Sequence, residues 1–65
     1  MHTKTIVMIC MIADEIYNEE LKGMDANEFF EKYDSGELDE LILPHLNYVE
    51  LIDNVRAELV TYFEV

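Results

Sequence analysis

The sequence is poor in positive charge. Four lysines and arginines stand against fifteen aspartates and glutamates, which leaves a formal net charge of −11. Nucleic acids and anionic membranes repel such a chain, so we expect neither as a direct partner. The magnitude also exceeds the net charge of about 2 to 8 that suits a soluble small domain. The shortage of bases therefore favours a positively charged protein as the partner.

Cysteine, glycine and proline are scarce as well. Cys10 is the only cysteine, so no disulfide can form within the chain, and a reducing, cytoplasmic location is expected. Two glycines and one proline among 65 residues exclude a collagen-like chain and a low-complexity linker. Because 51% of the residues are hydrophobic, the composition is that of a folded chain, and the length predicts a single domain over residues 1–65.

Long hydrophobic runs are absent. The longest uncharged apolar run, residues 5–13, has nine residues, whereas a membrane-spanning helix needs about 20. The segment that follows is acidic and has no small-residue cleavage site, so it does not fit a secretory signal. We therefore expect no membrane association and no targeting segment.

Turn-forming residues divide the chain into helical segments. Gly23, the Asp34-Ser35-Gly36 sequence and Pro44 mark the boundaries. The segments between them are residues 3–22, 25–33 and 37–43, and a last one that begins near Asn47. Their apolar residues recur at helical spacing, so the predicted fold class is all-α, a small bundle of three to four helices.

The first segment is apolar on more than one side. A stripe that includes Ile9 and Ile16 predicts the side that faces the core. Val7, Met8 and Met11 lie outside this stripe. A chain this short buries only about 60% of its surface and can hardly cover both sides of one helix. We therefore predict a homodimer with these three residues in its interface.

A strand is the alternative for the start of the chain. Residues 4–12 are rich in β-branched side chains, which favour strands. Residues 59–65 have a similar composition and would be the partner strand in an α+β fold. We favour the helix and keep this strand pair as the alternative.

Capping patterns predict where the later helices begin. Asp25 with Glu28, and Asn47 with Glu50, have the spacing of a capping box. Glu28 should also pair with Lys32 one turn later. The last segment carries the clearest apolar stripe: Tyr48, Ile52, Val55, Leu59, Tyr62 and Phe63.

The candidate metal ligands and nucleophiles do not have the spacing of a known site. Neither the two histidines, His2 and His45, nor Cys10 match zinc-ligand patterns. We interpret His2 as a frayed end, His45 as part of the start of the last helix, and Cys10 as a buried hydrophobic residue. Residues 34–40 lack the ligand positions of an EF-hand loop. We therefore expect no metal, no cofactor and no enzymatic activity.

One pair of residues has a family resemblance. Asp34-Ser35, followed by a short acidic segment, resembles the phosphopantetheine attachment site of acyl carrier proteins. Gly36 stands where that family has leucine, and Pro44 ends the next segment early. The resemblance implies a carrier protein modified at Ser35; a turn and cap residue is the other interpretation.

The acidic residues concentrate in two parts of the chain, which we predict to bind the partner. The first acidic patch is Asp25, Glu28, Glu31, Asp34, Glu37, Asp39 and Glu40. The second acidic patch is Glu50, Asp53 and Glu64.

The spacing of these acids suggests a function. Carboxylates one helical turn apart are about 5–6 Å from each other, close to the roughly 7 Å between phosphates of a nucleic-acid strand. We predict a small acidic protein that binds a basic, nucleic-acid-binding protein, most specifically a phage-type or mobile-element-type inhibitor that mimics DNA. The alternative is a structural or accessory homodimer that interacts through its apolar first helix.

Overall fold

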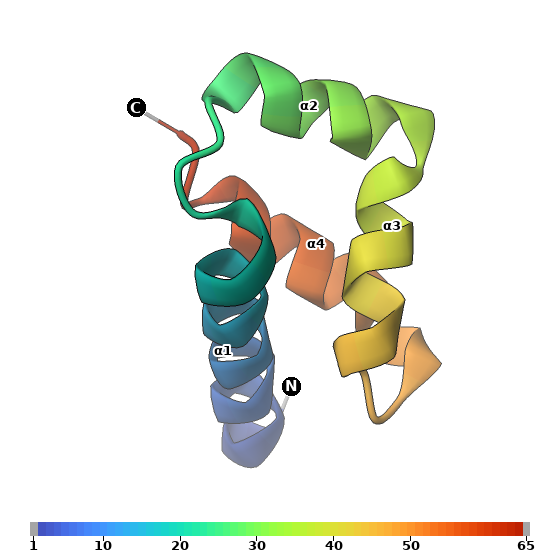
Figure 1. Ribbon diagram of the computed structural model, residues 1–65. Coiled ribbons are helices and arrows are strands. Elements are labelled where there is room, and N and C mark those ends of the chain that lie inside the picture. Colours follow the sequence, from blue (N-terminus) through green and yellow to red (C-terminus); the bar gives the residue numbers. More distant parts are fainter. Residues whose placement is uncertain (1, 65) are drawn as a thin grey trace.

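Helices make up most of the chain, of which the computed structural model describes residues 2–64 (Figure 1). In chain order they are α1 (Thr3–Ile16), the π-helical turn η1 (Tyr17–Leu21), α2 (Ala26–Ser35), α3 (Glu37–Ile42), the 3-10 turns η2 (Leu43–His45) and η3 (Val49–Leu51), and α4 (Ile52–Val60). No strand occurs between residues 2 and 64, so the all-α prediction is confirmed for this part. The strand alternative is wrong, because residues 4–12 are helical and 59–64 end α4 and form a turn. Val65, the end of that predicted strand, lies outside the described residues.

The helices surround a core to which all four contribute. Figure 1 shows α1 and α3 on either side, α2 across one end, and α4 in the space between α1 and α3. The buried core consists of Ile9, Ile12, Ala13, Ile16, Leu21, Phe29, Leu38, Ile42, Leu51, Val55, Leu59 and Phe63. None of the helices within residues 2–64 has the length and hydropathy needed to cross a bilayer.

Aromatic stacking joins α2 to the end of the chain. Phe29, fully buried, stacks on Phe63 with ring centroids 4.2 Å apart and planes 10° apart. Tyr17 in η1 stacks on Tyr62 at 4.6 Å. These contacts close the bundle at the end where α1 gives way to α2.

The capping patterns in the sequence predict the start of α2 correctly and the start of α4 wrongly. The Asp25 carboxylate accepts a hydrogen bond from the Glu28 N–H at 2.8 Å, as the capping pattern predicts. Gly36 ends α2 in the left-handed region, with φ of 88°, which glycine adopts without a steric penalty. Asn47 does not start α4: the helix begins at Ile52, after the turn η3.

The apolar stripe of the last segment is confirmed only where α4 and the turn after it pack on the core. Val55, Leu59 and Phe63 are buried. Tyr48 is 55% exposed, because its backbone is extended and lies before the helical region. The helical spacing in the sequence placed Tyr48 on the apolar face of the last helix, but that helix begins only at Ile52, so Tyr48 does not belong to this face.

Candidate functional site

The acidic residues remain at the surface. No charged side chain between residues 2 and 64 is buried. On α2, Glu28, Glu31 and Asp34 follow one another in steps of three residues and are exposed, whereas Phe29 points into the core. Side chains at this spacing are neighbours on a helix surface. We call these three carboxylates the acidic ridge. The helix that carries them, α2, lies across one end of the molecule (Figure 1).

Lysine neutralises one side of the first acidic patch but not the ridge. The Lys32 ammonium lies 3.1 Å from the Glu37 carboxylate, across the corner between α2 and α3. The predicted pair of Lys32 with Glu28 is therefore wrong, because the sharp turn at Gly36 brings Glu37 within reach. Within residues 2–64, neither the acidic ridge nor Glu40 takes part in an ion pair.

Arg56 links the two predicted patches. Its guanidinium donates to both carboxylate oxygens of Asp39, at 3.1 and 3.2 Å, and to the carboxylate of Asp53. It also lies over the Tyr33 ring, 5.7 Å from the centroid. Arg56 thus joins α4 to α2 and α3.

The second acidic patch does not form one helix face. Glu50 lies in η3, Asp53 in the first turn of α4, and Glu64 beyond the turn at residues 61–63. All three are exposed. Because α4 ends at Val60, Asp53 and Glu64 do not lie on one face of a continuous helix.

The apolar side of α1 differs in detail from the predicted interface. Val7 and Met11 are exposed, Met11 by 67%. Met8 packs against the core instead, because it is the i−4 neighbour of the buried Ile12. Ile6, in the first turn of α1, is exposed although its spacing from Ile9 fits the side that faces the core. On α1, the large apolar residues that remain exposed are therefore Ile6, Val7 and Met11.

An open groove of about 350 Å³ runs between α1 and α4. Its lining consists of Ile6, Ile9, Cys10, Asp53, Asn54, Ala57 and Glu58. Cys10 is exposed, which corrects the expectation of a buried thiol. It follows the buried Ile9 and is rotated from it by about 100° around the helix axis. The groove therefore joins the uncovered side of α1 to carboxylates of α4.

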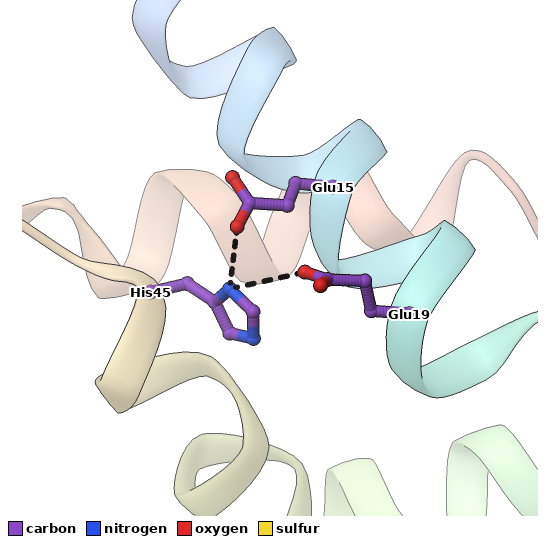
Figure 2. Close-up of side chains that lie close together, drawn as sticks. All are labelled: Glu15, Glu19 and His45. Carbon is purple, nitrogen blue, oxygen red and sulfur yellow. Dashed lines mark hydrogen bonds and ion pairs between the residues drawn. The ribbon is translucent and has the colours of Figure 1, made fainter.

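A histidine and two glutamates converge elsewhere in the fold (Figure 2). His45 Nδ1 is 3.2 Å from Glu15 Oε1 and 3.9 Å from Glu19 Oε2. Its Nε2 is 3.8 Å from Glu20 Oε1. Glu15 and Glu19 lie one turn apart across the junction of α1 and η1, and η2 turns His45 towards them after Pro44. His45 therefore does not help to start α4, contrary to the prediction.

The sequence carried no distinctive signal for this cluster. His45 lies 30 residues from Glu15, so spacing along the chain could not join them. Two glutamates four residues apart are also unremarkable in a chain with fifteen acidic residues. The other histidine, His2, is not a frayed end: its Nδ1 accepts a hydrogen bond from the Lys4 N–H at 3.2 Å and caps α1.

Ser35 occupies the corner between α2 and α3. Its hydroxyl donates to the Lys32 carbonyl and accepts from the Glu37 N–H, both at 3.3 Å. These contacts are those of a turn and cap residue. The helix that follows, α3, has only six residues and passes directly into η2 at Leu43.

The phenol of Tyr62 has a shifted pKa. Burial is the main cause, and the negative charges of Asp14 and Glu58 add to it; together they raise the pKa of Tyr62. The hydroxyl lies 3.5 Å from Asp14 Oδ1, so the interaction ties the end of the bundle to α1.

Comparisons with protein-family models, with curated proteins and with solved structures find no match to this chain. The acidic ridge, the uncovered side of α1 and the histidine–glutamate cluster are the features from which its function is inferred.

Proposed function

We propose that this protein binds a positively charged protein surface through the acidic ridge of α2. The observation that supports this is that Glu28, Glu31 and Asp34 are exposed and that, between residues 2 and 64, none of them forms an ion pair. Lys32, the base nearest to the ridge in sequence, pairs with Glu37, and Arg56 pairs with Asp39 and Asp53. Lysines and arginines of a partner would relieve the repulsion within the ridge and speed association.

The most specific form of this proposal is mimicry of nucleic acid. Carboxylates at one-turn spacing are about 5–6 Å apart, which approaches the spacing of phosphates along a strand. The partner is then a nucleic-acid-binding protein whose basic groove the acidic ridge occupies. The chain should compete with nucleic acid for that groove and bind no nucleic acid itself.

The experiment begins with capture of a partner on the immobilised chain at low and at high salt, because an electrostatic complex weakens with added salt. The captured protein is then titrated with nucleic acid in the presence of the chain. Simultaneous binding of both, with neither affinity changed, would contradict mimicry. Loss of binding to nucleic acid in proportion to the added chain would support it.

Two triple variants test whether the ridge itself binds. One carries Glu28→Lys, Glu31→Lys and Asp34→Lys. The other makes the same change in net charge at three exposed acids outside both acidic patches: Asp14→Lys, Glu15→Lys and Glu19→Lys. The ridge variant should associate at least tenfold more slowly, and the control should be affected less. Equal losses in both would show that net charge, not the ridge, governs binding. Circular dichroism should show that both variants keep their helices.

A homodimer is the second candidate, favoured by the exposed apolar residues of α1. We infer that Ile6, Val7 and Met11 pack against a second copy, because burial of such a side chain contributes about 1.5–3 kcal/mol. Sedimentation at micromolar concentrations should then report twice the mass of 7.7 kDa. Val7→Glu with Met11→Glu should restore the monomer, and Glu31→Gln is the matched control on an unrelated surface. A monomer throughout that range would reject the dimer.

A further inference from the structure

We propose that Glu15, Glu19 and His45 bind a divalent first-row transition metal, for which Zn²⁺ is the probe. Imidazole nitrogen and carboxylate oxygen are donors that these ions accept. One donor atom from each residue lies within 4.8 Å of the other two. Ligands about 2.0–2.2 Å from a shared zinc ion are separated by roughly 3.5 Å. Movement of about 1 Å in the two exposed glutamate side chains therefore closes the site.

The imidazole of His45 is already held in place. Its side chain is only 14% exposed, and Figure 2 shows Nδ1 directed between the two carboxylates. His45 belongs to η2, and the two glutamates belong to the junction of α1 and η1. Metal binding therefore has to order only the ends of the glutamate side chains. Three protein donors leave a further coordination position for water, as in open zinc sites.

The charge of the cluster favours a cation. Glu20 brings a third carboxylate to within 3.8 Å of His45 Nε2. Between residues 2 and 64, the partner of these carboxylates is the one imidazole, and no lysine or arginine pairs with them. Three carboxylates around one imidazole leave an excess of negative charge that a divalent ion reduces.

Such a site would also connect distant parts of the chain. Glu15 and Glu19 belong to the junction of α1 and η1, whereas His45 belongs to the connection between α3 and α4. An ion that binds the folded form alone raises its stability. The melting temperature should therefore rise as Zn²⁺ is added, and this readout does not depend on any protein partner.

The experiment is a calorimetric titration of the untagged full chain with ZnCl₂, together with Co²⁺ as a spectroscopic probe of coordination. We expect one Zn²⁺ per chain. His45→Gln and Glu19→Gln should each weaken the affinity at least tenfold and reduce the visible Co²⁺ absorption. Two variants serve as controls: His2→Asn, which keeps a capping residue at α1, and Glu28→Gln, which removes the same charge from the acidic ridge. Both should bind Zn²⁺ as the unmodified chain does.

The outcomes separate a metal site from an ion pair. No saturable binding, or unchanged affinity in His45→Gln, would show an imidazole–carboxylate ion pair only. Equal weakening by Glu28→Gln and Glu19→Gln would show a diffuse counterion effect. If the His45→Gln variant loses its helices, the affinity of the Glu19→Gln variant tests the metal site instead, because Glu19 is exposed and its replacement leaves the core untouched. Binding at the acidic ridge is measured with other variants, so either proposal can fail alone.

Discussion

Replacement of Phe29 by alanine should remove much of the stability of this protein. The ring is fully buried and contacts two other aromatic rings closely: it stacks on Phe63 at 4.2 Å and meets the edge of Phe30 at 5.0 Å. Because Phe29 joins α2 to the end of the chain, the cavity left by its removal lies between elements distant in sequence. Relaxation of one helix alone would not fill it.

The magnitude follows from burial and contacts. Phenylalanine-to-alanine changes in protein cores cost about 3–5 kcal/mol, which includes the cavity. A chain of 65 residues has a free energy of unfolding of about 3–10 kcal/mol. Phe29→Ala therefore removes a large share of the stability, and at the lower end of that range the chain would not stay folded.

The neighbouring residue provides the matched control. Phe30 is 37% exposed, so Phe30→Ala should cost about 1–2 kcal/mol. Urea unfolding followed by circular dichroism at 222 nm measures both, and tyrosine fluorescence gives a second signal because the chain has no tryptophan. Equal losses in the two variants would refute the packing of α2 described above.

Three further changes test separate features. Gly36→Ala should lower the free energy of unfolding by about 1 kcal/mol, because φ is 88° there, although no atom obstructs a Cβ. Gly36→Asn should lower it by less. An alanine variant that is more stable in urea unfolding would contradict the left-handed turn. Arg56→Gln should cost about 1–2 kcal/mol in the same assay because it breaks the contacts with Asp39, and a double variant with Asp39→Asn should cost less than the sum of the two single changes. The raised pKa of Tyr62 favours the folded form while the phenol is protonated, so its contribution is present below about pH 10 and is lost as the pH rises through the folded-state value. From pH 8 to 11 the melting temperature of Tyr62→Phe should fall less than that of the unmodified chain. An identical fall in both would show that groups other than Tyr62 cause the loss of stability at high pH.

Features that depend on neighbours within one or two turns could be predicted. Asp25 caps α2, Gly36 ends it, and the stripe of Ile9, Ile12 and Ile16 faces the core, because capping and helical periodicity act over a few residues. Composition alone also predicts the acidic surface, since carboxylates without partners stay exposed to water. These signals were enough for the all-α fold class.

Features that depend on which helices meet could not be predicted. The tertiary structure decides that Met8 is covered while Ile6 is not, and that Lys32 turns to Glu37 rather than to Glu28. The same is true of His45 beside Glu15, since thirty residues of chain separate them and only the folded arrangement of the helices brings the two side chains together. The physical reason is one of range: a helix repeats every 3.6 residues from local bonds, whereas contacts between helices depend on how side chains from all of them fill one core.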